Sequence, residues 1–335
     1  MSEWMTMIRP VLTFRQQGVR FRWWHELALC LLLLLLLVVA DLLVPNFASY
    51  RSQLFLSRPL WEIAILALGM TLIIITGGID LSVGSAMGMC AITFGWVFFQ
   101  TQSATLAGLA CIVVGGLGGM INGTLVARLR IHPLIVTLAT YAVFRGVAEG
   151  ASQGREYSPF PDTFTQLARK IWLGIPLPGV VFLVLVVAVA LLLHRTATGR
   201  YLYAIGHNER AARFSGVRVD RVKFGLYTFS GLLAGVATVL HVSRFGTARA
   251  NAGTGFELDV ITAVIVGGTS IFGGRGNVVG TMLGLLLIHE TRQFVSRYWR
   301  INELNSIVVG TLLIVSILIY RILARRDVSQ PSHAA

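Results

Sequence analysis

The chain has 335 residues, of which 55% are hydrophobic and only 13% charged, and its formal net charge is +13. Soluble domains carry about 25% charged residues, so this composition indicates a protein whose solvent is lipid. The basic residues gather at the ends of apolar segments, which argues against a nucleic-acid-binding surface. The three cysteines lie inside apolar segments without metal-ligand spacing. We therefore expect no metal, no cofactor and no catalytic residue.

Apolar runs of about 20 residues predict membrane-spanning helices. The expected fold is all-α, a polytopic bundle of about ten spans, of which two are interrupted by glycine. In chain order the predicted segments are Leu27–Val44, Leu60–Ile79, Gly84–Phe99, Ala104–Val126, Pro133–Gly150, Pro178–His194, Phe224–Phe245, Asp259–Phe272, Asn277–Val295 and Leu304–Tyr320.

The basic loops predict the orientation of these segments, because cytoplasmic loops are enriched in Lys and Arg. We expect residues 1–26 to be a cytoplasmic N-terminal segment, 27–320 the membrane domain and 321–335 a cytoplasmic tail. An even number of spans places every basic cluster on the same side. These clusters are Arg9 to Arg22, Arg128 with Arg130, the loop 195–223, and Arg321 to Arg326.

Two of the segments break at paired glycines that are followed by small polar residues. Breaks at membrane depth persist only where protein or a water-filled cavity covers the backbone, and matching breaks in two halves of a transporter point to the solute pathway. Close packing of helices through small residues is the alternative, and it is our interpretation of Gly115–Gly119. The pathway candidates are Gly77, Gly78, Asp80, Ser82, Gly84 and Ser85 in the first break, and Gly267, Gly268, Thr269, Ser270, Gly273 and Gly274 in the second.

Asp80 is a carboxylate in an apolar setting, where a charge costs about 3 kcal/mol. It could be a helix N-cap, accepting amide protons at the start of a helix from Leu81, or it could contact the solute directly or act in gating. The two roles are compatible.

The basic loop 195–223 contains a predicted short helix over Glu209–Phe214, with Asn208 as its N-cap and Gly216 ending it. A helix of two turns is not stable alone and needs a docking surface. A plain basic loop is the alternative to a helix that couples to a partner. The candidate coupling residues are Asn208, Glu209, Arg210, Ala211, Ala212, Arg213, Phe214, Ser215 and Gly216.

Several of these stretches resemble, in order, the permeases of the ribose-type family of ATP-binding-cassette (ABC) importers. The matches are Gly77–Ser85, Asn122–Val126, Thr137–Gly146, Ala204–Gly216 and Val266–Gly276, and they span roughly residues 60 to 320. Phe214-Ser-Gly and Ser243–Arg249 look most like the subgroup for rhamnose, related deoxy sugars and the sugar-like autoinducer. His207 departs from the family, which commonly has a small or polar residue there.

The resemblance implies a multi-pass subunit of the bacterial inner membrane that imports a sugar. Its implied partners are a second permease copy or paralogue, a cytoplasmic ATPase and a periplasmic solute-binding protein, with lipid around it. The chain is not expected to be an enzyme, because neither of its two lysines, Lys170 and Lys223, stands in a phosphate-binding loop. A permease for nucleosides or branched-chain amino acids, and an ion-coupled secondary transporter, are the alternatives.

Overall fold

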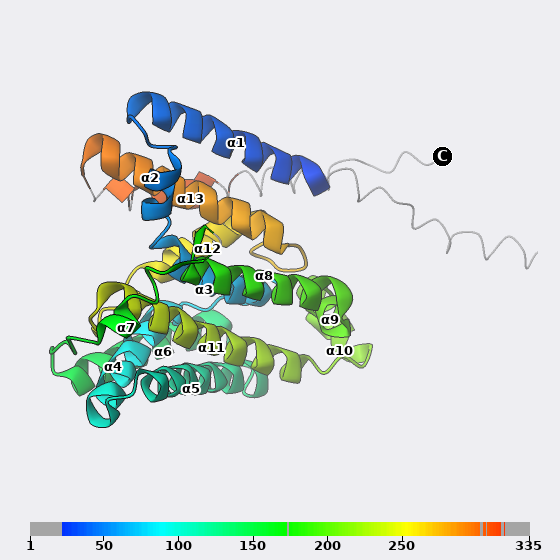
Figure 1. Ribbon diagram of the computed structural model, residues 1–335. Coiled ribbons are helices and arrows are strands. Elements are labelled where there is room, and N and C mark those ends of the chain that lie inside the picture. The colour runs from blue at the N-terminus through cyan, green and yellow to red at the C-terminus, as the bar shows by residue number, and fades with distance from the viewer. Residues whose placement is uncertain (1–21, 173, 302–303, 306, 316–317, 319–335) are drawn as a thin grey trace, which may run out of the picture.

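The computed structural model describes residues 22–172, 174–301, 304–305, 307–315 and 318, and these form a bundle of helices (Figure 1). The predicted all-α polytopic fold is confirmed, with one pair of two-residue antiparallel strands on a connection. In chain order the elements are α1 Arg22–Leu43, α2 Tyr50–Leu56, α3 Leu60–Ile75, α4 Val83–Thr101, α5 Ala104–Gly123, the π-helix η2 Thr124–Arg128, α6 Pro133–Ser152, α7 Asp162–Thr165, β1 Ile171–Trp172, β2 Ile175–Pro176, α8 Leu177–Arg195, α9 Ala197–His207, α10 Glu209–Phe214, α11 Val219–Phe245, α12 Phe256–Val266 and α13 Val278–Trp299.

Within the described part of the chain, six helices are long and apolar enough to cross a membrane. They are α1, α4, α5 with η2, α6, α8 and α11. A seventh span is formed if α2 and α3 are taken together, although the chain bends by 60° between them. The expected N-terminal segment and C-terminal tail lie almost entirely outside the described residues.

Helix α3 lies at the centre of the bundle and contacts α8, α11, α12 and α13 (Figure 1). Its sequence is apolar on every side, which suits a helix enclosed by other helices. Nearly all of its residues are buried, including Ala64, Leu68 and Ile74, none of which exposes any surface. The C-terminal end of α3 is therefore held firmly inside the protein, and the first break starts there.

Helices α5 and α11 pack with their backbones close together through glycine. A Cβ atom on Gly119 would collide with the carbonyl oxygen of Tyr227, and one on Gly231 would collide with the carbonyl oxygen of Gly115. Small residues allow such an approach between helices in lipid. The interpretation of Gly115–Gly119 as a packing surface is confirmed.

Candidate functional site

The two predicted breaks begin with the same local structure. After α3, Gly77 has φ of +78° and the amide of Gly78 donates to the carbonyl of Ile73. After α12, Gly268 has φ of +88° and the amide of Thr269 donates to the carbonyl of Val264. A left-handed residue followed by this backbone bond is the usual glycine-based helix end.

The structural repeat is displaced by one residue from the alignment of the paired glycines. Gly77 corresponds to Gly268, so Gly267 corresponds to Thr76, the C-cap of α3. Gly267 has an ordinary right-handed conformation, and a Cβ atom added to it would collide with the carbonyl oxygen of Gly280 in α13. Close helix packing therefore explains the glycine at 267.

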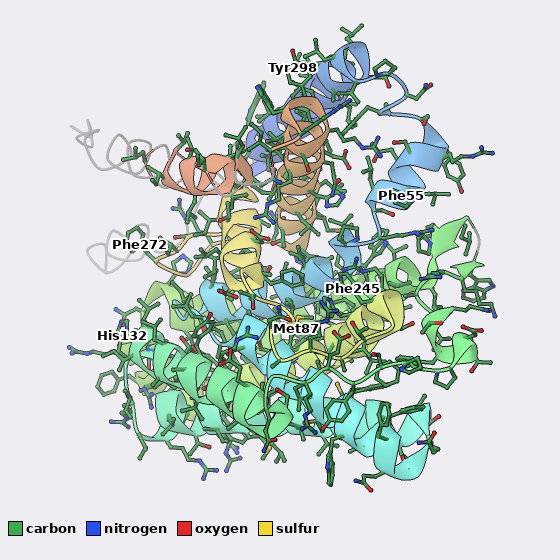
Figure 2. The ribbon with its side chains drawn as sticks, turned by 90° about the vertical axis from the view of Figure 1, so that its left-hand side faces the viewer. Phe55, Met87, His132, Phe245, Phe272 and Tyr298 are labelled. Carbon is green, nitrogen blue, oxygen red and sulfur yellow. The ribbon has the colours of Figure 1, made fainter. Side chains whose placement is uncertain are left out.

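The two breaks touch each other, although almost two hundred residues separate them. The amide of Gly274 donates a hydrogen bond to the carbonyl oxygen of Ile75, the last residue of α3, at 2.9 Å. The second break also folds back on itself, because the amide of Ser270 donates a hydrogen bond to the carbonyl oxygen of Arg275. Phe272, at the tip, is 73% exposed and lies at the edge of the bundle, whereas Met87 lies in its middle (Figure 2).

The C-terminal end of α9 rests on this junction. A Cβ atom on Gly206 would collide with the carbonyl oxygen of Ile75 and the amide nitrogen of Gly274, so α9 contacts both breaks through a residue without a side chain. The hydroxyl of Tyr203 donates to the carbonyl of Gly276 at 2.8 Å. Sequence reasoning missed both α9 residues, because a lone glycine and a lone tyrosine carry no pattern of their own.

Asp80 belongs to a buried polar cluster. Its Oδ1 accepts hydrogen bonds from the amide of Ser82 at 3.0 Å and from the hydroxyl of Ser82 at 2.6 Å. Its Oδ2 accepts from the hydroxyl of Ser230 in α11 at 3.3 Å. The expected cap position is wrong: helix α4 begins at Val83 and its N-cap is Ser82, so Asp80 orders the turn before the helix.

Asn122 of α5 completes the cluster, and its Nδ2 donates to the hydroxyl oxygen of Ser82 at 2.8 Å. The hydroxyl proton of Ser82 is already used on Asp80, so Asn122 must be the donor. Around these groups the cavity is about 10 Å³, enough for about one water molecule. The polar cluster around Asp80 therefore leaves no room for a sugar-sized molecule in this structure.

The remaining candidates of the first break lie in the first turn of α4 and are fully covered. Ser85 donates from its hydroxyl to the carbonyl of Ser82. A Cβ atom on Gly84 would collide with the carbonyl oxygen of Gly253 and with the carboxylate of Glu257. The connection between α11 and α12 thus packs against α4, and sequence reasoning did not anticipate this contact.

In the second break, Thr269 and Ser270 are buried, while Gly273 lies near the amide of Gly77. The start of α1 also touches this break. His25 Nε2 lies 3.2 Å from the carbonyl oxygen of Val266, and Glu26 accepts from the amide group of Asn277, the N-cap of α13, at 2.8 Å.

The predicted short helix is confirmed as α10, Glu209–Phe214, at the end of the bundle where α8 and α11 also meet α9 (Figure 1). Asn208 caps it by accepting the amide of Ala211 at 3.0 Å, and Gly216 follows with φ of +85°. The carbonyl oxygens of Ala212 and Arg213 accept the amides of Val217 and Gly216, which closes the helix end together with Ser215.

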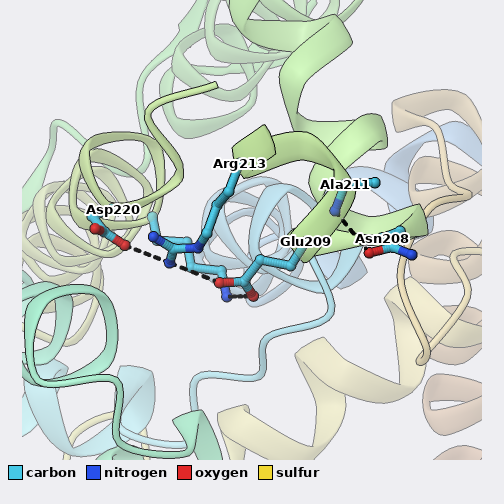
Figure 3. A network of polar contacts seen from close by, with 6 residues as sticks. Asn208, Glu209, Ala211, Arg213 and Asp220 are labelled. Carbon is cyan, nitrogen blue, oxygen red and sulfur yellow. Dashed lines mark hydrogen bonds and ion pairs between the residues drawn. The ribbon is translucent and has the colours of Figure 1, made fainter. Parts of the chain in front are cut away.

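A network of charges fixes α10 to the start of α11 (Figure 3). Arg213 bridges Glu209 at 2.9 Å and Asp220 at 2.5 Å, and Lys223 reaches the other oxygen of Glu209 at 2.6 Å. Burial raises the pKa of Glu209, but the hydrogen bonds and charges of Lys223 and Arg213 outweigh burial and hold that pKa below its ordinary value. Isolated exposed pairs contribute about 0–1 kcal/mol, so the network orients the helix more than it stabilises the fold.

The two faces of α10 differ in exposure. Ala212 is 4% exposed and packs with Ile205 and Val219 beneath the helix. Phe214 is 93% exposed at its end, and Arg210 and Ala211 are exposed as well. The side of α10 opposite Ala212 is therefore uncovered, and its apolar part is the ring of Phe214.

This arrangement defines a class of protein: a polytopic membrane permease whose two interrupted helices are linked, through α9, to the exposed and capped helix α10. Residues 59–317 match the family described as "Branched-chain amino acid transport system / permease component". The chain is 37% identical over 306 residues to the autoinducer 2 import system permease protein LsrD of Escherichia coli strain K12, covering 90% of this chain and 93% of the relative. The proteins of the same name from Shigella flexneri and Escherichia coli O157:H7 match with the same identity and coverage.

The chain belongs to this family of permeases, of the ribose-type ABC importers, and is a transport subunit rather than an enzyme. The resemblance drawn from the glycine-rich stretches is therefore confirmed. No solved structure matches the chain.

Proposed function

We propose that the chain is a multi-pass permease subunit of the bacterial inner membrane that passes a sugar-like solute, and that a separate cytoplasmic ATPase drives it through α10. A periplasmic binding protein delivers the solute, and a second permease copy or paralogue completes the path. The relatives' name supports this solute class, because they belong to autoinducer 2 import systems.

The contact of α9 with both breaks is the observation that carries this proposal. Gly206 lies against Ile75 and Gly274, and α10 follows α9 after the single residue Asn208. A displacement of α10 by a partner would therefore act on both breaks through α9.

The topology belongs to the proposal as well. Ten spans, with both termini cytoplasmic, require α3, α12 and α13 to cross the membrane together with the helical residues 307–315. In that arrangement α10 and the connection from η2 to α6 share the cytoplasmic side. The interrupted helices α3 and α12 then end near that side.

Replacing Phe214 by alanine tests the coupling role. Phe214 suits this test better than Ala212, because Ala212 is buried beneath α10 and a larger residue there would disrupt the helix itself. With its partner subunits, Phe214→Ala should insert normally and lose ATP-driven uptake of autoinducer 2, while Phe214→Leu should retain part of it. Full uptake by Phe214→Ala would overturn the assignment of α10.

Import of a branched-chain amino acid is the second candidate, and the description of the matching family favours it. The two solutes are distinguished by supplying leucine and autoinducer 2 separately to vesicles that contain the complete system. Uptake of leucine without uptake of autoinducer 2 would replace the sugar-like solute and leave the coupling mechanism unaffected.

A further inference from the structure

A pocket of about 490 Å³ lies between α10 and the connection from η2 to α6, away from the two breaks. Its walls come from two parts of the chain, one around Arg130 and the other from Glu209 onward, almost eighty residues further along. The lining residues are Val126, Arg130, Ile131, His132, Pro133, Glu209, Arg210, Arg213 and Lys223.

The pocket has a surplus of positive charge. Glu209 is the one carboxylate among its lining residues, and it already binds Arg213 and Lys223. Arg130 and Arg210 are exposed, and neither forms an ion pair within the described residues. Asp220, next to the pocket, binds Arg213, and the charge of Arg130 also helps to lower the pKa of that carboxyl, so four basic side chains face two carboxylates here. Two guanidinium groups at one opening are suited to binding carboxylate groups in a bidentate manner.

The backbone of the rim is held by the end of η2. The π-helix η2 leads into it, and Arg130 has φ of +55°, a conformation uncommon outside glycine. The amide of Ile131 bonds the carbonyl of Leu125 at 3.2 Å and holds this turn in place. This geometry is a left-handed helix end, and it fixes where Arg130 stands at the rim of the pocket.

We propose that this pocket receives an acidic segment of the cytoplasmic ATPase, next to the docking site of α10. The inference rests on the proposed function. Helix α10 forms a wall of the pocket and carries the exposed Phe214, so one protein partner could cover the aromatic side chain and place carboxylates between Arg130 and Arg210. A volume of several hundred Å³ fits a few side chains.

Binding through such a pocket depends on salt, because charges at the rim act mainly on the rate of encounter and are screened by ions. We expect the affinity of the permease for its ATPase to fall as the salt concentration rises. Removing the charges of Arg130 and Arg210 should lower the affinity and reduce that salt dependence.

The test measures binding of the co-purified ATPase to the whole chain in lipid nanodiscs, over a series of salt concentrations. The variants are Arg130→Glu combined with Arg210→Glu, and Arg130→Gln alone, which lies outside α10 and leaves that helix intact. Arg221→Glu is the matched control, since Arg221 is exposed and does not line the pocket. The double variant should bind at least about tenfold more weakly, with a shallower salt dependence, and the control should bind normally.

Two results would overturn the inference. If the double variant binds as the wild type does while Phe214→Ala does not, α10 docks the ATPase but the pocket has no part in it. If the variants differ from the wild type only in nanodiscs with anionic lipid, the pocket binds lipid headgroups instead. Failure of the wild-type chain to bind any ATPase would instead refute the proposed function itself.

Discussion

The amide of Gly274 donates a hydrogen bond to the carbonyl oxygen of Ile75, and this bond joins the two interrupted regions of the permease. Ile75 ends the central helix α3, and Gly274 lies in the loop that follows α12. Gly206 of α9 packs against both of these residues. The two breaks and α9 therefore form one structural unit, and α10 is joined to it through Asn208.

The substitution Gly206→Ala tests this unit directly. The added methyl group would collide with backbone atoms of Ile75 and Gly274, which cannot move aside as side chains do. Overpacking of this kind costs about 1–3 kcal/mol. We expect a lower melting temperature in detergent and loss of transport. Gly225→Ala is the control, because nothing lies within 4 Å of its Cβ position, and equal behaviour of the two variants would contradict the close contact.

A second prediction concerns Asp80, and it asks whether transport requires the hydrogen bonds of this side chain or its negative charge. Asparagine at this position keeps an acceptor for the amide and hydroxyl of Ser82, whereas alanine leaves both unpaired in a buried place. Each unpaired buried group costs about 1–3 kcal/mol. Asp80→Asn should therefore retain most of the transport and stability, and Asp80→Ala should lose both. Equal loss from both substitutions would mean that the negative charge itself is needed.

A third prediction concerns the opposite end of α3. Glu62 is 2% exposed and binds Arg244 at 2.7 Å and His241 at 2.8 Å, both from α11. Removing one member of a buried charge pair leaves the other uncompensated, at a cost of about 3 kcal/mol or more. Glu62→Leu should destabilise the protein strongly, as measured by its melting temperature. Combining it with Arg244→Leu should recover much of the loss, and simple addition of the two single effects would contradict a direct pair.

The topology gives a fourth prediction. Ser329 lies outside the described residues, and an even number of spans places it in the cytoplasm. In a variant without the native cysteines, Ser329→Cys should react with a membrane-impermeant thiol reagent only after the inner face is opened. Reaction in intact spheroplasts, where the outer surface of the inner membrane is exposed, would refute the ten-span arrangement.

Sequence patterns predicted the parts of this protein that are set locally. The prediction of a short helix at Glu209–Phe214 was correct at both ends. Its cap, Asn208, and the glycine that ends it, Gly216, lie close to the helix in the chain. The breaks after α3 and α12 were predicted for the same reason, since a glycine that ends a helix acts on the residues beside it.

Contacts between distant segments could not be predicted in this way. Nothing in the sequence indicates that Gly206 lies on Ile75, or that Asn122 and Ser230 complete the hydrogen bonds around Asp80 and Ser82. The same limitation explains Gly267, whose residue type suggests a turn but whose packing partner, Gly280, belongs to the next helix. The pocket beside α10 likewise combines Arg130 and Arg210 from separate segments.

ATP-driven transport through α10 is tested first by purifying the chain gently from its native membrane and identifying the proteins that remain bound. We expect an ATPase with a phosphate-binding loop, which is released from the complex when Phe214 is replaced by alanine. A chain that purifies alone and moves solute in proteoliposomes without ATP would contradict this expectation.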